Sequence, residues 1–405
     1  MSWQLNMILR MAPVLLPVYL YCGWRVSSAL IQLFGFSPGW TRSITAAGIL
    51  FINLLPLAIL YRSRSGELSR LILFQPSLQS ADFWLNFPFW FALVIAVESV
   101  LYLIGLDLLG GLFRLIPAWR PQNWLSLKSA FVLGIVLFFT IFAVYRVYRD
   151  SCQVQLRPYQ IPVKNLASEL ADLRLTFVSD VQVDRYSGET KLQHYREQVA
   201  AAGGDLILFG GDLVTSGEDF IDPALDLMGR HQAPLGKIAC LGDHDFWANP
   251  GRIAGGLRDA GWDFLDNAHQ LIDYRGKRIL VTGVTYIYSR RISEADLREL
   301  LERAPEADLR ILLVHQPAGM VVRLAEEYGY DLLLAGHTHG GQLVFRPFGL
   351  TLTPTRLENQ FYSGRYQFGR MAVLVTNGVG LTLAPFRYRA PAEVMRVEFA
   401  RMEDE

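Results

Sequence analysis

Long apolar runs dominate the first 150 residues of the chain. They are almost free of charge, since 43–61 and 129–145 contain none and 11–40 contains only Arg25. A helix needs about 20 apolar residues to cross a bilayer, so the pattern predicts four membrane-spanning helices, roughly at 11–34, 43–61, 88–113 and 129–147. A cleaved signal peptide would explain only one such run. A buried helical core is the alternative interpretation.

Three charged residues fall within or near the predicted spans, namely Arg25, Glu98 and Asp107. A charge inside a membrane is unfavourable and is therefore a hypothesis of function. The simpler interpretation is an internal ion pair between the arginine and a carboxylate, or side chains that reach the headgroups. We favour this simpler interpretation.

The rest of the chain alternates between short apolar runs and amphipathic segments. The runs are typical of buried strands and are expected at 173–179, 205–209, 237–241, 310–314 and 331–335. Helical spacing lies between them, at 192–202, 250–260, 293–304 and 320–328. A β-hairpin is expected over 270–285, with Arg275-Gly276 at its turn. The pattern predicts a transmembrane region over 1–150 and a soluble α/β domain over 151–405.

Charge and composition support the same division. The chain has 51% hydrophobic residues, a mean hydropathy of +0.23 and no net charge. Residues 1–150 carry 11 basic and 5 acidic side chains, whereas the remainder carries 27 and 33 together with all seven histidines. This excludes a disordered chain and a basic nucleic-acid-binding protein. The three widely spaced cysteines exclude a disulfide scaffold and form no zinc pattern.

Five successive predicted strands each end in an acidic or imidazole side chain. The residues at these ends are Asp180, Asp212, Asp243, His315, and His337 with His339. The carboxyl ends of strands are where α/β folds place ligands. Carboxylate and imidazole together suit divalent transition metals. The pattern therefore predicts a metal site at these strand ends.

In this order the motifs resemble those of the calcineurin-like metallophosphoesterases. The family motifs D-x-H, G-D, G-N-H-D/E, a lone H and G-H-x-H correspond here to Asp180-Val181-Gln182, Gly211-Asp212, Gly242-Asp243-His244-Asp245, His315 and Gly336-His337-Thr338-His339. The resemblance covers roughly 165–400. Residues 376–380 and 385–387 also resemble the closing strand of the subfamily that has N-terminal membrane segments.

The resemblance implies both a fold and a set of metal ligands. The fold would be an α/β phosphoesterase domain, a two-sheet β-sandwich flanked by helices, after an all-α transmembrane bundle of four helices. The site would hold two divalent metal ions, Mn, Fe or Zn, with Asp212 as the bridge. The first ion would take Asp180, His339 and the Gln182 amide, and the second would take Asp243, His315 and His337.

Two further residues would serve catalysis without binding metal. The resemblance implies that His244 lies over the phosphate, where it stabilises developing charge or protonates the leaving oxygen. Asp245 would orient His244 through a hydrogen bond, as a carboxylate behind a functional imidazole commonly does.

The chain departs from the family motifs at two of the ligand positions. Gln182 stands where the family has a histidine, and an amide oxygen coordinates metal more weakly than imidazole does. Asp243 stands where the family has a neutral asparagine, and its charge strengthens cation binding. Some relatives add a tyrosine ligand at the position of Thr215, for which Asp184 is a candidate replacement. We interpret these changes as drift within an active subfamily.

The combined prediction is a membrane-anchored, metal-dependent phosphoesterase that cleaves a phosphate ester or a pyrophosphate. The expected partners are the lipid bilayer and a phosphorylated, lipid-linked substrate, because tethering raises the local concentration of such a substrate. A phospholipid, an isoprenoid phosphate and a nucleotide precursor of the UDP-2,3-diacylglucosamine type are all examples. No nucleic-acid partner is indicated, and no oligomeric state is implied. Two alternatives stay open, namely a phosphodiesterase or phosphatase for soluble substrates and a catalytically silent module on a membrane sensor or transporter.

Basic residues in short loops predict the orientation in the membrane. With four spans, the N-terminus, the 62–87 loop and the segment after 147 share one side and carry eight Lys and Arg. The opposite loops carry four, namely Arg42, Arg114, Arg120 and Lys128. The bias places residues 148–405 in the cytoplasm, at the plasma (inner) membrane.

The remaining histidines and basic stretches have ordinary interpretations. His194 is expected to be solvated on a helix, and His231 and His269 are expected in loops. The short basic stretches Arg290-Arg291 and 387–389 could touch an anionic substrate or the membrane face, but a solvated surface is the simpler expectation.

Overall fold

The chain divides into two compact units. The computed structural model describes residues 3–65, 81–115, 121–185, 187–382 and 384–402. The first unit comprises Met1–Tyr148 together with the short segments Phe345–Leu352 and Leu383–Pro385. The second comprises Arg149–Val344, Thr353–Thr382 and Phe386–Glu405.

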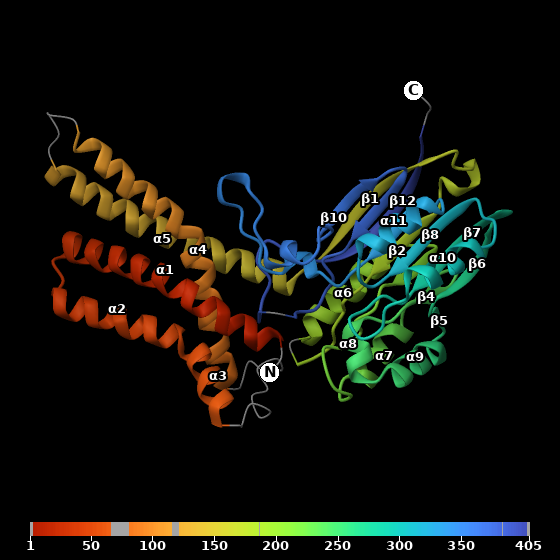
Figure 1. Ribbon diagram of the computed structural model, residues 1–405, viewed down its shortest axis with the longest axis horizontal. Helices are drawn as coiled ribbons and strands as arrows, with labels where there is room; N and C mark the ends of the chain where they lie inside the picture. Colours follow the sequence, from red (N-terminus) through yellow and green to blue (C-terminus); the bar gives the residue numbers. More distant parts are fainter. Residues whose placement is uncertain (1–2, 66–80, 116–120, 186, 383, 403–405) are drawn as a thin grey trace. The chain divides into compact units, whose positions relative to one another are not determined.

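The first unit consists of apolar helices (Figure 1). They are α1 (Trp3–Phe34), α2 (Pro38–Ile52), α3 (Leu54–Ser65), α4 (Ala81–Phe113) and α5 (Pro121–Cys152). Within the described residues, three apolar stretches are long enough to cross a membrane, namely Leu5–Phe34, Trp84–Phe113 and Trp124–Cys152. The predicted N-terminal transmembrane helices are confirmed.

The second predicted span differs from expectation, because it is not one continuous helix. α2 and α3 are bent by 50° at the break and have the length of a span only when taken together. Pro56 lies in the first turn of α3 and has no N–H to continue the hydrogen bonding of α2. At the break, the Asn53 side chain donates to the Ile49 carbonyl at 2.8 Å, a local bond of the kind that competes with regular helix.

A group of charged side chains joins three helices of this unit. Arg25 of α1 pairs with Asp107 of α4, and the Tyr21 hydroxyl donates to the same carboxylate at 2.8 Å. Lys128 of α5 is 2.5 Å from the other oxygen of Asp107. The expected arginine–carboxylate pair is confirmed. Lys128, counted above as a loop residue, lies inside a helix, while Arg70 and Arg120 lie outside the described residues.

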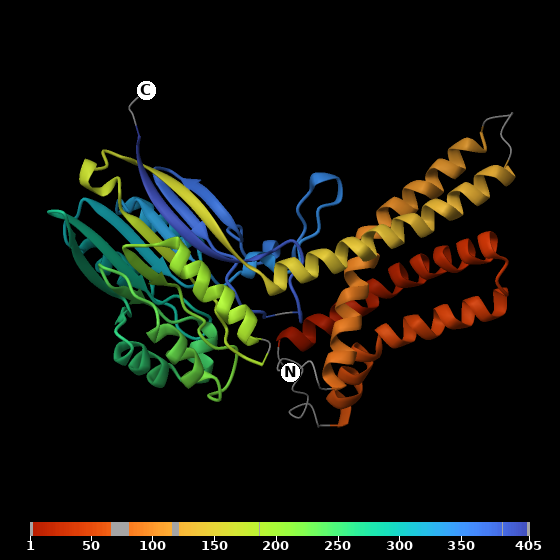
Figure 2. The same cartoon turned by 180° about the vertical axis from the view of Figure 1, so that it is seen from behind.

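The second unit is a β-sandwich with helices on both outer faces (Figures 1 and 2). One six-stranded sheet has the order β1 (Val154–Lys164), β12 (Ala392–Met402), β2 (Arg174–Val178), β3 (Leu206–Phe209), β4 (Lys237–Ala239) and β5 (Asp263–Phe264). The other has the order β10 (Gly364–Phe368), β11 (Met371–Val375), β9 (Leu332–Ala335), β8 (Leu309–Val314), β7 (Lys277–Val284) and β6 (Ala268–Tyr274). The predicted two-sheet α/β domain is confirmed.

The core lies between the two sheets and also beneath the helices. Successive strand residues face opposite sides. Thus Leu208 of β3 packs between the sheets with Ile311 of β8, whereas Phe209 faces outward. The outer face of the first sheet is covered by α6 (Glu189–Ala202), α7 (Ile221–Gly229) and α9 (Pro250–Asp259). The outer face of the second is covered by α10 (Glu294–Glu302) and α11 (Gly319–Glu327).

The predicted hairpin is present, but the predicted closing strand lies elsewhere. β6 and β7 pair antiparallel, and Arg275 and Gly276 both have positive φ (51° and 78°) at the tight turn. Residues 376–387 form a loop, and the strand that closes the first sheet is β12, five residues later. The loop cannot continue β11 as a strand because its backbone amides at Val379 and Gly380 turn back to the Asp180 carbonyl.

Candidate metal centre

The candidate site lies where the carboxyl ends of both sheets meet. Asp180 and Asp212 follow β2 and β3, and Asp243 begins the short helix α8 (Asp243–Ala248) after β4. His315 directly follows β8, and His337 follows β9. Because β2, β3 and β4 are parallel to one another, as are β8 and β9, their ends deliver these side chains to one edge of the sandwich.

The structure brings the predicted ligands together in two overlapping groups. Asp180, Asp212 and His315 place one ligand atom each within 4.8 Å of one another, and so do Asp243, His315 and His337. His315 therefore belongs to both groups. Its Nε2 is 3.2 Å from Asp212 Oδ2 and 3.5 Å from Asp243 Oδ2. On either side, His337 Nδ1 is 3.0 Å from Asp243, and His339 Nε2 is 3.4 Å from Asp180.

Buried atoms without hydrogen-bond partners show that these residues fit cations. His315 Nδ1 bonds the Gly210 carbonyl at 2.8 Å, so in the neutral ring Nε2 is a bare acceptor. That nitrogen and Gln182 Oε1 are both buried and form no hydrogen bond. His315 Nε2 stands between carboxylate oxygens of Asp212 and Asp243, which are also acceptors. An acceptor that faces acceptors in a buried site requires a cation or a proton between them.

The charges of the site also indicate that it binds cations. Burial disfavours the charged imidazolium of His315, but the carboxylates of Asp212, Asp243 and Asp180 together outweigh burial and raise the pKa of His315 well above its usual value. Burial likewise raises the pKa of Asp180, although His315 opposes this. Three carboxylates close together therefore hold on to positive charge, and protons and metal ions compete for the same atoms.

The backbone is strained at these residues. Five of the seven predicted ligands have positive φ, a region that residues other than glycine rarely adopt: Asp180, Gln182, Asp212, His337 and His339. Such conformations cost about 1–3 kcal/mol each and cluster at functional sites. Gly336 allows the close approach, because a Cβ there would collide with the Asp180 carboxylate.

Asp243 is held by hydrogen bonds that an uncharged asparagine could only partly accept. Its Oδ1 accepts from the Tyr288 amide at 2.6 Å, and its Oδ2 accepts from Gln316 Nε2 at 2.7 Å. Burial alone would raise its pKa, but the adjacent imidazoles of His315 and His337 hold the pKa of Asp243 well below its ordinary value. The position is therefore built for an ionised carboxylate.

Asp245 does not orient His244, contrary to the expectation from the resemblance. Its buried carboxylate accepts from the backbone amides of Asp212, Leu213 and Gly242 at 2.7–3.0 Å. Burial, with the Asp212 carboxylate adding to it, raises the pKa of Asp245 to about 7. The side chain braces the loop that carries Asp212 and the first turn of α8, and this occupies both of its oxygens.

His244 is instead oriented by the backbone. Its Nδ1 contacts the Thr215 carbonyl at 2.5 Å, and its own amide donates to Asp212 Oδ1 at 2.8 Å. The ring lies against Trp247, with centroids 5.0 Å apart. Donation from Nδ1 leaves Nε2 to exchange a proton with a bound group. The role of His244 stays a prediction.

The candidate replacement Asp184 is turned away from the predicted ligands. Its Oδ2 accepts from the Thr215 hydroxyl at 2.8 Å, and its Oδ1 accepts from the Ser187 amide at 3.1 Å. It therefore helps to fix the loop between β2 and α6. It belongs to neither group of candidate ligands among the described residues.

Arg387 is the residue that sequence reasoning missed most clearly. The stretch 387–389 was expected at a solvated surface, but the Arg387 side chain is fully buried. Its guanidinium donates to backbone carbonyls of His339, Asn377, Gly380 and Ala390, and one nitrogen is 3.2 Å from His339 Nδ1. No sequence signal marked this arginine as buried, because its partners are mostly backbone atoms of distant loops.

The histidines interpreted as ordinary lie away from the site. His194, expected to be solvated, is half-buried on α6, and its Nδ1 contacts the Cys152 carbonyl at 3.2 Å. His231 is buried between Tyr195 and Trp262, and its Nε2 contacts the Tyr195 hydroxyl at 3.1 Å. His269 lies on β6 rather than in a loop, where Thr282 and the Leu300 carbonyl bond its ring nitrogens.

Comparisons with known proteins agree with this geometry. Residues 173–341 match the calcineurin-like phosphoesterase family model. A zebrafish (Danio rerio) transmembrane protein with a metallophosphoesterase domain is 26% identical over 329 residues, which is 78% of this chain and 73% of that protein. The Bacillus subtilis metallophosphoesterase YkuE is 28% identical over 172 residues, 42% of this chain and 58% of that protein.

Solved structures show weaker similarity. An archaeal phosphodiesterase is 12% identical with a TM-score of 0.30, over 51% of this chain and 84% of that one. The family match, by contrast, spans every predicted ligand from Asp180 to His339, and apolar helices precede it. Residues 173–341 therefore form a calcineurin-like phosphoesterase domain that follows apolar helices, and the chain is a membrane-associated phosphoester hydrolase.

Proposed function

We propose that this protein uses two divalent cations to hydrolyse a phosphate ester or pyrophosphate of a lipid-linked substrate. The observation that carries the proposal is the convergence of three carboxylates and His315 in two overlapping groups at one edge of the sandwich. When bound, divalent cations at such a site supply positive charge to phosphoryl oxygens and lower the pKa of a water nucleophile. Manganese, iron and zinc all suit this donor set.

The chain itself would hold and orient the reacting groups. As the family resemblance implies, Asp180, Gln182 and His339 would hold one cation, Asp243, His315 and His337 would hold the other, and Asp212 would serve both. The contacts of His339 with Asp180 and of His337 with Asp243 support this division. His244 would keep its Nε2 toward the phosphate while its Nδ1 stays bonded to Thr215. There it would stabilise developing charge or give a proton to the leaving oxygen.

An exposed apolar loop supports the proposal that the substrate is lipid-linked. The segment Phe345–Leu352 comes from the sequence of the phosphoesterase region but belongs to the first unit. The Phe348 ring lies 5.9 Å from that of Tyr102 of α4, which is within a candidate span. Phe348, Leu350 and Leu352 are 76%, 66% and 51% exposed. Exposed apolar side chains of this kind suit lipid better than water.

The orientation in the membrane rests on the bias of basic residues between the two sets of loops. We therefore propose a cytoplasmic phosphoesterase domain at the plasma (inner) membrane. The proposed partners are the bilayer and a phosphorylated, lipid-linked molecule.

The test uses the full-length protein purified in detergent. We expect it to hydrolyse p-nitrophenyl phosphate or bis(p-nitrophenyl) phosphate with Mn²⁺ and to lose this activity when EDTA is added. Asp212→Asn should abolish turnover. His244→Ala should lower kcat by about 10²–10⁴-fold while the bound metal, measured by elemental analysis, stays the same.

The matched control is His194→Ala, because His194 is a half-buried histidine of the same domain outside the site. It should keep the wild-type rate. No turnover of either ester by folded protein with any of the three metals would contradict the hydrolase. Equal kcat/KM for a short-chain ester in solution and its long-chain analogue in micelles would contradict the lipid-linked substrate and favour a soluble one.

A further inference from the structure

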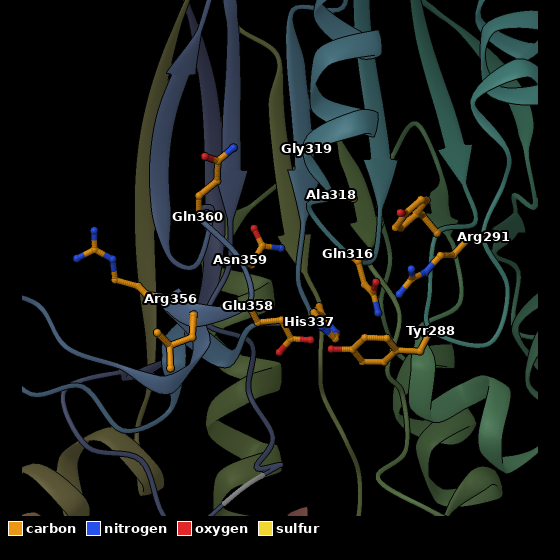
Figure 3. A pocket seen from close by; sticks show the side chains of 12 residues that line it. Tyr288, Arg291, Gln316, Ala318, Gly319, His337, Arg356, Glu358, Asn359 and Gln360 are labelled. Atoms are coloured by element: carbon orange, nitrogen blue, oxygen red, sulfur yellow. The ribbon is translucent and has the colours of Figure 1, made fainter. Parts of the chain in front are cut away.

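A polar pocket of about 480 Å³ opens beside His337 in the second unit (Figure 3). One wall comes from the loop after β7, with Tyr286, Tyr288 and Arg291, and the other from the segment that includes Arg356 and Glu358. The Tyr288 ring packs edge-on against His337, with centroids 5.3 Å apart. The pocket is thereby continuous with the candidate metal centre.

Arg291 is the unusual cation of this pocket. Its neighbour Arg290 pairs with Asp266 at 2.6 Å, which is the ordinary arrangement for a surface arginine. Arg291 has no acidic partner among the described residues. Instead its guanidinium carbon lies 5.5 Å and 5.9 Å from the ring centroids of Tyr286 and Tyr288. Stacking on aromatic faces holds an arginine in place while its N–H edge stays free to bind a planar anion.

Other groups of the pocket suit an anion as well. Ala318 and Gly319 line it at the start of α11, whose N-terminus has no side-chain cap and adds partial positive charge. On the opposite wall, the Glu358 carboxylate points toward His337 and the Arg356 side chain points away from it (Figure 3). Gln316 already donates to Asp243, so it is fixed rather than free to follow a ligand. Arg291 therefore supplies positive charge on the wall opposite Glu358.

We propose that this pocket is a subsite for a second phosphate or similar anionic group of the substrate, with Arg291 as its main ligand. The inference rests on the proposed function, because the first phosphate would be held at the neighbouring metal centre. A guanidinium binds phosphate through two parallel N–H···O bonds. The substrate class is then a molecule with two phosphoryl groups, as in a diphosphate or a bisphosphate, rather than a simple monoester.

The experiment measures binding, so it does not depend on turnover. The probes are propylphosphonate and propane-1,3-bisphosphonate, titrated calorimetrically into full-length, Mn²⁺-loaded protein in detergent. Wild type should bind the bisphosphonate at least tenfold more tightly than the monophosphonate. Arg291→Gln should reduce this preference to less than threefold, and Arg291→Lys should keep part of it because the positive charge remains.

Arg290→Gln is the matched control, since it removes the same charge one residue away and outside the pocket. It should keep the wild-type preference, and chelation of free Mn²⁺ by the probe is the same for all variants. A preference that persists in folded Arg291→Gln, or none in wild type, overturns the subsite. Turnover of a p-nitrophenyl ester by the same wild-type sample reports separately on the hydrolase, so the two proposals can fail independently.

Discussion

At the residue scale, the site depends on groups that form hydrogen bonds with the candidate ligands or with the backbone around them. Gln316 donates to Asp243 Oδ2, and the Tyr288 amide donates to Oδ1. Asp245 holds three backbone amides around Asp212. Such partners set the direction and basicity of a ligand without binding the metal. Their loss should therefore weaken metal binding while the fold is kept.

Gln316→Ala tests this. Asp243 would lose one of its two neutral hydrogen bonds and its fixed rotamer, so we expect Mn²⁺ affinity to fall about 10–100-fold, as measured by calorimetric titration of the metal alone. Gln367→Ala, an exposed glutamine on β10, is the control and should bind Mn²⁺ like wild type. Unchanged affinity in folded Gln316→Ala would show that Asp243 needs no such support.

The buried His231 leads to a prediction about how the free energy of unfolding depends on pH. Burial lowers the pKa of His231 from 6.5 to about 4. Between these pH values the unfolded chain binds a proton that the folded chain does not. The stabilisation is fully present above pH 6.5 and is lost as pH falls toward 4, by about 3 kcal/mol in total. Thermal unfolding should show this loss for wild type and a flatter curve for His231→Gln; parallel curves would contradict it.

At the element scale, ion pairing joins the apolar helices while packing brings them close. Ala29, Leu103 and Val132 form a small cluster between α1, α4 and α5, and Asp107 lies where Arg25 and Lys128 meet. Small residues allow helices to approach within a membrane, where apolar surface alone provides no driving force. The charges therefore specify which helices associate.

Asp107→Asn should destabilise this bundle, because two cations lose their shared partner. Comparison with Arg25→Leu and with the double variant isolates the pair, and we expect a coupling free energy of about 1–3 kcal/mol from thermal unfolding in detergent. Additive effects would mean that the ion pair contributes nothing beyond its separate side chains.

At the scale of the whole molecule, metal binding and folding should be coupled. The carboxylates of Asp180, Asp212 and Asp243 lie close together in the folded domain, and an unfolded chain does not hold them there. Mn²⁺ should therefore stabilise the folded state by about 2.7 kcal/mol at 100 times its Kd. The midpoint of thermal unfolding should rise with Mn²⁺ for wild type and much less for Asp212→Asn. Equal shifts would place the metal elsewhere.

Much of this architecture could be predicted from the pattern of the chain. Period-two and helical spacing, with Arg275-Gly276 at a turn, were sufficient for the strands, the helices and the hairpin, because local propensity and burial agree there. The break in the second span was not predicted from the sequence, since only a single proline, at position 56, interrupts an otherwise apolar run. β1, β10 and β12 were missed because they mix polar and apolar residues, and β11 was missed although all five of its residues are apolar.

By itself, the sequence determined which residues carry the chemistry and that apolar helices precede them, because residue type, order and hydrophobic spacing are properties of the chain alone. Only the tertiary structure decided what each polar group faces. Arg387 is buried behind His339, Asp245 bonds backbone amides instead of His244, and Arg291 opens into a pocket. The reason is physical: a hydrogen bond or a burial depends on partners far away along the chain, which come together only when both sheets have formed.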